Sequence, residues 1–174
     1  MSLKGKSVLM FVDDGYEDQE FWYPKLRLME EGADVNVAST KKGIYKSKHG
    51  YEAKAEFAAV SINPSDYDCV IIPGGTVSAD RLRRDKTILD IVRKSFEQGK
   101  VVAAICHGPW ILISAGIVKG RKTTSFYSMK DDLQNAGAKY MGGKSVVVDG
   151  TLITSRQPED LPYFCKAIIN ALMK

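Results

Sequence analysis

The sequence predicts an α/β fold: a three-layer sandwich in which helices cover both faces of a mostly parallel sheet. Short apolar, β-branched runs alternate with stretches of helical spacing, which is the pattern of strand–helix–strand units. Several of these runs, such as residues 7–12 and 101–105, are continuously apolar, as expected of strands buried on both faces. Ligands bind beyond the carboxyl ends of the strands in such sheets. We therefore expect functional residues where these runs end.

The alternation assigns most of the chain to elements. Strands are predicted at residues 7–12, 34–39, 70–72, 101–105 and 123–126, and helices at residues 17–31, 87–98, 110–115, 129–136 and 158–173. The helix at 17–31 is expected to turn four apolar side chains to the core: Phe21, Leu26, Leu28 and Met29. Its internal Pro24 predicts a kink or a late helix start, because proline lacks the N–H that a helix interior uses.

Two further segments predict hairpins. Residues 43–57 are polar and turn-rich around His49 and Gly50, which favours a hairpin or a pair of short strands at one end of the sheet. Residues 145–154 carry Asp149-Gly150 between two β-rich runs, a strong hairpin pattern.

Composition limits the class of protein. A chain of 174 residues fits one domain, residues 1–174, and 44% hydrophobic with 26% charged residues is ordinary for a globular protein. The net charge of +4 is modest and the basic residues are dispersed, so no nucleic-acid surface is indicated. No apolar run approaches the ~20 residues that span a bilayer, and no secretory signal is evident. We therefore expect a cytoplasmic protein without a membrane partner.

The three cysteines are Cys69, Cys106 and Cys165, widely separated in the chain. Their spacing gives no C-x-x-C pair and no zinc pattern, and the two histidines add no metal signature. The sequence therefore implies neither a metal nor an organic cofactor. Cys69 and Cys165 lie in apolar stretches and are expected to fill the core.

Cys106 differs because an apolar strand stops at it and Cys106-His107-Gly108-Pro109 follows. Gly108 allows a close approach of the chain, and Pro109 suits the first position of a helix. This arrangement resembles the nucleophile elbow of α/β hydrolases, with cysteine in the place of serine. An exposed thiol at the start of a helix would favour the thiolate. Inert packing, the ordinary fate of a free cysteine, is the alternative.

A thiolate that attacks a carbonyl needs donors for the oxyanion it creates. The backbone N–H of His107 is one candidate, and Gly74-Gly75, at the end of another predicted strand, supplies a second. The pair of glycines could instead form an ordinary turn.

An acid beside the thiol is the next requirement. Glu17 is predicted to contact Cys106 and, when protonated, to lower the pKa of the thiol; otherwise it is only an acid in a first helical turn. Glu20, one turn on, could be a solvated surface charge. His107 is expected to be poorly placed to take the cysteine proton, because adjacent side chains usually point apart.

Several strings together resemble the ThiJ/PfpI superfamily, most closely the PfpI-type intracellular proteases. They run in order along nearly the whole chain: Glu17-Asp18-Gln19-Glu20, His49-Gly50-Tyr51, Ile72-Pro73-Gly74-Gly75, Ala104-Ile105-Cys106-His107-Gly108-Pro109, Gly120-Arg121-Lys122-Thr123-Thr124-Ser125, Lys130-Asp131-Asp132, Val147-Val148-Asp149-Gly150 and Gln157-Pro158-Glu159-Asp160-Leu161. The resemblance implies a flavodoxin-like sandwich, related to class I glutamine amidotransferase domains, that self-associates into dimers or hexamers.

By position, the resemblance makes Cys106 the nucleophile, His107 its catalytic partner and Glu17 the carboxylate against the thiol. It also implies an acid from a neighbouring subunit, for which Asp80 is the matching residue. Asp80 departs from the pattern, because it is a shorter acid in a segment one residue longer that lacks the usual proline.

Three functions stay open at this stage. The first is a cofactor-independent glyoxalase or protein deglycase acting on carbonyl compounds, and the second is an intracellular cysteine peptidase; hydrolase chemistry is favoured. The third is a non-enzymatic sensor or chaperone in the oxidative-stress response, in which Cys106 is oxidised. An accessible, acidic thiol would serve all three.

Overall fold

The computed structural model describes residues 2–174 and is built on a seven-stranded sheet. The strand order is β10-β11-β7-β6-β1-β2-β5. The strands are β1 (Ser7–Phe11), β2 (Asp34–Ser39), β5 (Phe57–Ala58), β6 (Cys69–Ile72), β7 (Val101–Ile105), β10 (Val146–Asp149) and β11 (Leu152–Ser155). All neighbours pair in parallel except β10 and β11, which form an antiparallel hairpin. The predicted mostly parallel sheet is confirmed.

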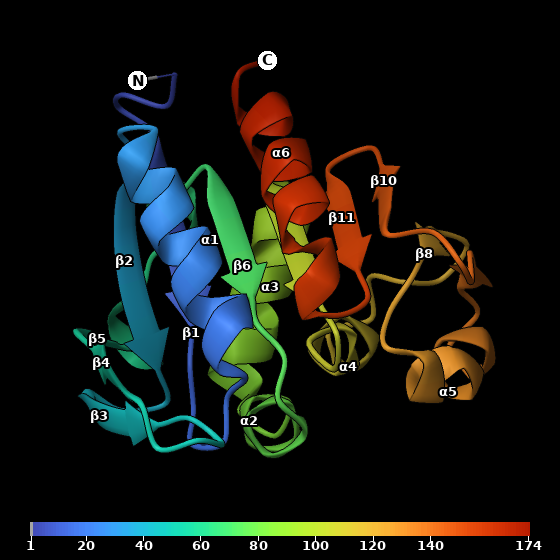
Figure 1. Ribbon diagram of the computed structural model, residues 1–174, viewed down its shortest axis with the longest axis horizontal. Coiled ribbons are helices and arrows are strands. Elements are labelled where there is room, and N and C mark those ends of the chain that lie inside the picture. Colours follow the sequence, from blue (N-terminus) through green and yellow to red (C-terminus); the bar gives the residue numbers. More distant parts are fainter. Residues whose placement is uncertain (1) are drawn as a thin grey trace.

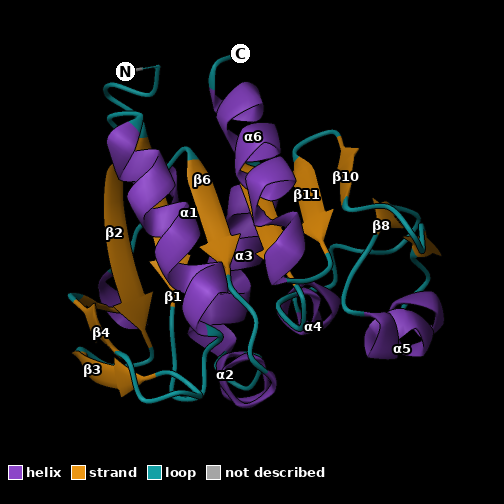
Figure 2. Cartoon of the chain, in the orientation of Figure 1, coloured by secondary structure: helices purple, strands orange, loops and turns teal. Residues whose placement is uncertain are grey.

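Helices cover both faces of this sheet (Figures 1 and 2). One face packs against α1 (Asp18–Glu30) and α6 (Leu161–Leu172), and the opposite face against α2 (Thr76–Leu82), α3 (Lys86–Glu97) and α4 (Pro109–Ser114). The predicted three-layer sandwich is therefore confirmed. The short helix α5 (Lys130–Asn135) lies at one end of the molecule, beside β8 (Lys122–Thr123) and β9 (Lys139–Tyr140), which pair in a small separate sheet.

Strand β1 shows how the sequence builds the two cores. Val8 and Met10 belong to the core under α1 and α6, whereas Leu9 and Phe11 belong to the core on the opposite face. All four side chains are fully buried, as the alternation of a strand covered on both sides requires. Burial of each large apolar side chain contributes about 1.5–3 kcal/mol to folding.

Helix α1 differs from its prediction in two ways. Phe21 and Leu28 are buried, but Leu26 and Met29 are 57% and 49% exposed, so the expected core face was too wide. Pro24 lies inside the helix and is buried, and the helix begins before it, at Asp18. The buried positions 21, 24 and 28 form a narrow stripe, which explains why the residues beside it face outwards.

Both predicted hairpins are present, but the hairpin in residues 43–57 forms a separate two-stranded sheet instead of extending the main sheet. Strands β3 (Gly43–Lys46) and β4 (Glu52–Ala55) pair antiparallel in a sheet of their own, while β5 adds to the edge of the main sheet.

Helix α2 was not predicted, because seven residues are too few to show a helical period. The strand expected at 123–126 is reduced to β8. The final helix begins with a 3₁₀ turn, Pro158–Asp160.

Two further properties of the described residues bear on the predictions. No helix in residues 2–174 has the length and apolar character needed to cross a bilayer. Cys69 and Cys165 are buried, as predicted for core residues.

Candidate active site

Three segments meet at the carboxyl edge of the sheet. Strands β1, β6 and β7 are neighbours in parallel, so the loops that follow Phe11, Ile72 and Ile105 leave the sheet side by side. These loops contain Glu17, Gly74-Gly75 and Cys106-His107. The predicted convergence of sequence-distant segments is confirmed, and the site lies where ligands bind in sheets of this kind.

Cys106 occupies a tight turn between β7 and α4. Its φ of 60° is positive, and among the described residues no other non-glycine residue has a positive φ. This is a strained conformation for an L-residue, and such outliers cluster at functional sites. Gly108 permits the turn, because a Cβ there would lie 2.5 Å from the carbonyl oxygen of Ile72. The predicted elbow is present, but its thiol is less accessible than expected, because Cys106 is only 8% exposed.

Glu20, not Glu17, is the carboxyl that interacts with the Cys106 thiol. Glu20 is fully buried, so the interpretation of it as a solvated surface charge is wrong. The carboxylate of Glu17 instead caps α1, accepting the backbone N–H of Glu20 at 2.9 Å. The expected contact between Glu17 and the thiol is therefore also wrong. Glu17 is the N-cap residue and its side chain turns back to its own helix, whereas Glu20, one turn later, faces the Cys106 turn.

The two carboxyl oxygens of Glu20 have different surroundings. Oε2 accepts the backbone N–H of Gly74 at 2.9 Å, whereas Oε1 is buried without a hydrogen-bond partner among the described residues. Burial, followed by the negative charge of Glu17, raises the pKa of Glu20 to about 8. The carboxyl is therefore mostly protonated at neutral pH, and a protonated carboxyl can donate to sulfur.

The two glycines have separate tasks. The N–H of Gly74 is already used by Glu20, so Gly74 does not supply the donor predicted for the substrate. The backbone N–H groups of Gly75 and His107 both act on the sulfur of Cys106 and favour its ionised form. A side chain at Gly74 would collide with both neighbours, since its Cβ would lie 2.3 Å from Glu20 Oε2 and 2.7 Å from Cys106 Cβ.

His107 lies closer to the thiol than its adjacent position suggests. Its Nδ1 is 3.2 Å from Cys106 Sγ, because the left-handed backbone at Cys106 breaks the alternation of an extended chain. The imidazole packs against Trp110 and Phe126, with ring centroids 5.1 and 5.2 Å away. Burial lowers the pKa of His107, and the carboxylate of Asp132 opposes that shift. The imidazole is therefore neutral at neutral pH.

The ionisation of Cys106 does not follow the prediction of an acidic thiol. Burial, followed by the charge of Glu20, raises the pKa of the Cys106 thiol, and the N–H groups of His107 and Gly75 only partly offset this. Helix α4 has six residues, so its dipole is weak. The thiol and the Glu20 carboxyl titrate together, so each of their two ionisation steps is a property of the pair and not of one residue.

Asp80 lies apart from this pair. It is on α2, its side chain is 60% exposed, and its carboxylate is 3.8 Å from the guanidinium of Arg84. A role for Asp80 in the site of a neighbouring subunit stays a prediction.

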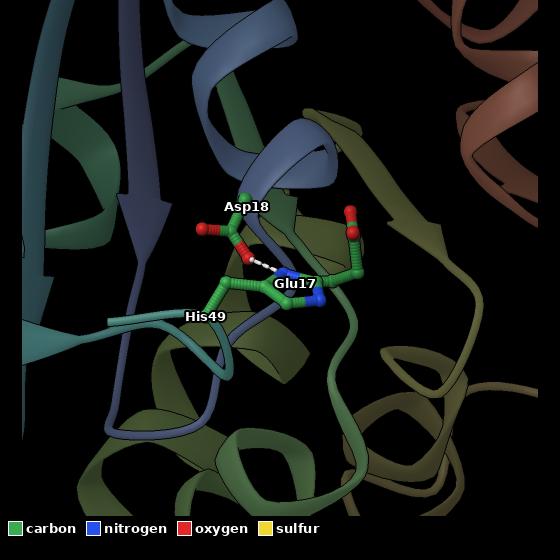
Figure 3. Close-up of side chains that lie close together, drawn as sticks. All are labelled: Glu17, Asp18 and His49. Atoms are coloured by element: carbon green, nitrogen blue, oxygen red, sulfur yellow. Dashed lines mark hydrogen bonds and ion pairs between the residues drawn. The ribbon is translucent and has the colours of Figure 1, made fainter. Parts of the chain in front are cut away.

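A second group of titratable side chains lies at the start of α1 (Figure 3). Ligand atoms of Glu17, Asp18 and His49 lie within 4.8 Å of one another. Asp18 accepts from Ser47 Oγ and, at 2.7 Å, pairs with His49 Nδ1, while Glu17 caps the helix. Because these groups already satisfy one another, the cluster is a hydrogen-bond network, and we assign no metal to it.

Comparison with known proteins fits this geometry. Residues 6–171 match the model of the DJ-1/PfpI family. The chain belongs to this family. Deglycase PfpI of Pyrococcus furiosus is 42% identical over 165 residues, covering 95% of this chain and 98% of that protein. YraA of Bacillus subtilis, named as a candidate cysteine protease, is 37% identical, covering 96% and 98%.

Solved structures in the family have the same fold. Drosophila melanogaster DJ-1beta superposes with a TM-score of 0.90 at 32% identity, covering 97% of this chain and 90% of that one. A two-domain protein from Anabaena variabilis with DJ-1/ThiJ/PfpI-like and ferritin-like domains gives 0.93 at 38% identity, over 96% of this DJ-1/PfpI chain. This chain spans only 48% of that protein. The flavodoxin-like sandwich implied by the sequence resemblance is thereby confirmed.

Proposed function

We propose that this DJ-1/PfpI protein is a cysteine enzyme that acts on reactive carbonyl compounds, as a cofactor-independent glyoxalase or protein deglycase. The observation that carries the proposal is the Cys106 sulfur at a strained elbow, facing the Glu20 carboxyl and the N–H groups of Gly75 and His107. Relatives 42–43% identical to this chain are named deglycases, which supports the same choice.

The first step is attack of sulfur on an aldehyde carbon. Loss of one proton from the Cys106–Glu20 pair leaves a single proton between the sulfur and the carboxyl. As the C–S bond forms, Glu20 holds that proton and then supplies it to the new oxyanion, giving a hemithioacetal. The N–H groups of Gly75 and His107 are the donors that we assign to the oxyanion while it exists.

With methylglyoxal, the hemithioacetal rearranges before it is hydrolysed. The Glu20 carboxylate first moves the proton from C1 to the oxygen on C2, giving an enediol. It then moves the proton of the C1 hydroxyl to C2, giving a lactoyl thioester on Cys106. Water then hydrolyses the thioester, which restores the thiol and releases lactate and one proton. The overall change is methylglyoxal plus water to lactate plus a proton, so neither oxidant nor cofactor enters the balance.

The test is lactate formation from methylglyoxal by the wild-type chain and two substitutions. We expect Cys106→Ser and Glu20→Gln each to lower kcat/KM about 10²–10⁴-fold, the range for a lost nucleophile activator or general base. Glu30→Gln is the matched control, because this exposed carboxylate lies at the opposite end of α1 from the site; its activity should stay within a few-fold. Absence of lactate with the wild-type chain would overturn the proposal.

A peptidase is the second candidate. The 3.2 Å separation between His107 Nδ1 and Cys106 Sγ favours it, since this is the contact of a Cys–His pair. YraA, which is 37% identical, is named as a candidate cysteine protease. Peptide cleavage that depends on Cys106, His107 and Asp80 would support this activity. Clean oxidation of Cys106 by peroxide, with neither substrate turned over, would favour the non-enzymatic stress sensor or chaperone.

Self-association completes the proposal. Dimers or hexamers are implied by the family, and a peptidase site would need Asp80 from a neighbouring subunit. The carbonyl chemistry uses groups of one chain, so Asp80→Asn separates the two activities. It should abolish peptide cleavage and leave methylglyoxal turnover unchanged.

A further inference from the structure

The imidazole of His107 packs against two aromatic rings beside the thiol. Trp110 meets it edge-on, with ring centroids 5.1 Å apart and planes inclined by 63°, and Phe126 lies 5.2 Å away with planes inclined by 32°. Phe126 is itself fixed to the elbow, because its backbone N–H donates to the carbonyl of Cys106 at 3.1 Å. These rings confine the imidazole in the position that places its Nδ1 3.2 Å from Cys106 Sγ.

Partners on two other helices set the position of Trp110. Its indole N–H donates to Oδ2 of Asp132, on α5, at 2.8 Å. The guanidinium of Arg83, at the end of α2, lies over the indole ring at 5.4 Å from the centroid, and its Nε donates to Ser114 Oγ on α4. One group holds the edge of the indole and the other holds its face, so a rotation of the ring would break both contacts.

Asp132 is thus connected to the sulfur by contacts that follow one another without a gap. The carboxylate holds the indole, the indole packs on the imidazole of His107, and the imidazole contacts Sγ. The negative charge of Asp132 also acts on the imidazole, since it opposes the lowering of the pKa of His107 by burial. The other ionisable groups around this ring are the Cys106 thiol, Arg83 beyond the indole and Tyr127 beyond the phenyl ring.

We infer that Asp132 is a positioning residue for the active site, which holds the His107 imidazole beside the Cys106 sulfur through the indole of Trp110. Asp132 belongs to the same chain as the thiol, so this orientation of the imidazole does not need an acid from a neighbouring subunit. The inference rests on the proposed carbonyl chemistry for the step in which the imidazole takes part.

Hydrolysis of the lactoyl thioester is the step that needs a held imidazole. Neutral His107 takes a proton from a water molecule while the oxygen of that water bonds to the thioester carbon. The C–S bond then breaks, and the imidazolium returns this proton to the Cys106 sulfur, which its Nδ1 already contacts. The thiol is restored, and the lactic acid formed releases the one proton of the overall reaction.

The experiment compares Asp132→Ala with Asp132→Asn in lactate formation from methylglyoxal. Asparagine keeps an acceptor for the indole N–H and removes the charge, whereas alanine removes both. With Asp132→Ala we expect kcat to fall about tenfold, at the modest end of general-base effects, and KM to fall with it, because a step after bond formation is slowed. The lactoyl thioester on Cys106 should then accumulate, which intact-protein mass spectrometry detects. Asp132→Asn should keep kcat within a few-fold of the wild-type value.

Titration of His107 by NMR gives a second measurement that does not depend on turnover. Without the negative charge, the pKa of His107 should fall in Asp132→Asn. His49, the other histidine of the chain, is the internal reference and should titrate as in the wild type. Asp131→Asn is the matched control, because it removes the same charge from the neighbouring exposed position of α5. It should change neither kcat nor the titration of His107.

Several results would overturn the positioning role. They are wild-type kcat in Asp132→Ala, a loss of kcat without accumulated thioester, a loss that Asp132→Asn shows equally, and an unchanged titration of His107 in Asp132→Asn. A wild-type chain that forms no lactate would instead contradict the proposed function. The titration of His107 would still measure, in that case, whether Asp132 acts on the imidazole.

Discussion

At the scale of the residue, the site depends on one carboxyl, Glu20. The sequence offered two acids at the end of the first strand, and their spacing alone did not show which would face the elbow. A helix start decides it: the cap residue turns its carboxylate back to the first N–H groups, so Glu17 is used locally. Three residues on, Glu20 shares a face with Phe21 and Leu28 against the sheet. A buried acid is uncommon, so the sequence alone favours a solvent-exposed position for Glu20.

The raised pKa of Glu20 makes a pH-dependent contribution to stability. An unfolded glutamate has a pKa near 4.5, whereas in the folded chain the pKa is about 8. Between these values the folded state binds more protons than the unfolded state, so the free energy of unfolding falls as pH rises. We expect Glu20 alone to remove a few kcal/mol from pH 5 to pH 8. Urea unfolding of the wild-type chain and of Glu20→Gln across this range measures it.

Glutamine imitates the protonated carboxyl, since it can accept from Gly74 and donate to sulfur. The Glu20→Gln chain should therefore lose this part of the pH dependence and be the more stable of the two at pH 8. If the free energy of unfolding of the variant changed with pH as steeply as that of the wild type, Glu20 would have an ordinary pKa. The proposed mechanism, which needs a protonated Glu20 at neutral pH, would then be wrong.

At the scale of the element, three turns bring backbone very close to backbone. The elbow at Cys106, the Gly74-Gly75 loop and the start of α1 meet within van der Waals distance, so the site has no room for a side chain at Gly74. The sequence correctly predicted where the glycines lie, but not that the N–H of Gly74 serves Glu20 rather than a ligand. That assignment depends on the rotation of α1, which no local pattern encodes.

Gly74→Ala tests this close approach. Its Cβ would collide with Glu20 Oε2 at 2.3 Å and with Cys106 Cβ at 2.7 Å, so the pair must move apart. We expect a loss of about 1–3 kcal/mol in the free energy of unfolding, the usual cost of overpacking, together with loss of lactate formation. The matched control is Gly43→Ala on β3, whose Cβ would meet only a tyrosine ring atom at 3.9 Å. Wild-type behaviour of Gly74→Ala would contradict the tight packing.

At the scale of the whole molecule, the ends of the apolar strands were the most reliable guide to the site. Continuous apolar runs at 7–12, 70–72 and 101–105 predicted buried parallel strands, and their ends were correctly expected to meet. The sequence could not show that β6 lies between β1 and β7, nor that burial would oppose ionisation of the thiol. Both depend on contacts between segments far apart in the chain. The exposure of Leu26 and Met29 was not predicted for a related reason: helical spacing alone does not show which apolar residues of a helix face the core.

Those exposed side chains lead to a prediction about assembly. Leu26 lies with Trp22, Tyr23 and Tyr51 in an apolar groove of about 660 Å³ that runs from α1 to the start of α6. A second copy of the chain is the occupant that we expect, because the family resemblance implies dimers or hexamers and apolar patches of this kind mark interfaces. We expect the wild-type chain to elute from size-exclusion chromatography with light scattering at a multiple of the monomer mass. Leu26→Asp should elute as a monomer with unchanged circular dichroism.

Val60→Asp provides the comparison for Leu26→Asp. Val60 is 83% exposed but lies in a 3₁₀ turn beyond β5, at the far edge of the sheet from β10, and does not line the groove. A charge there should leave the assembly intact, because no apolar surface is lost from the interface. If Leu26→Asp keeps the wild-type mass, or if the wild-type chain is itself a monomer, this groove does not hold a second copy. The proposed contribution of Asp80 from a neighbouring subunit would then need a different interface or would be lost altogether.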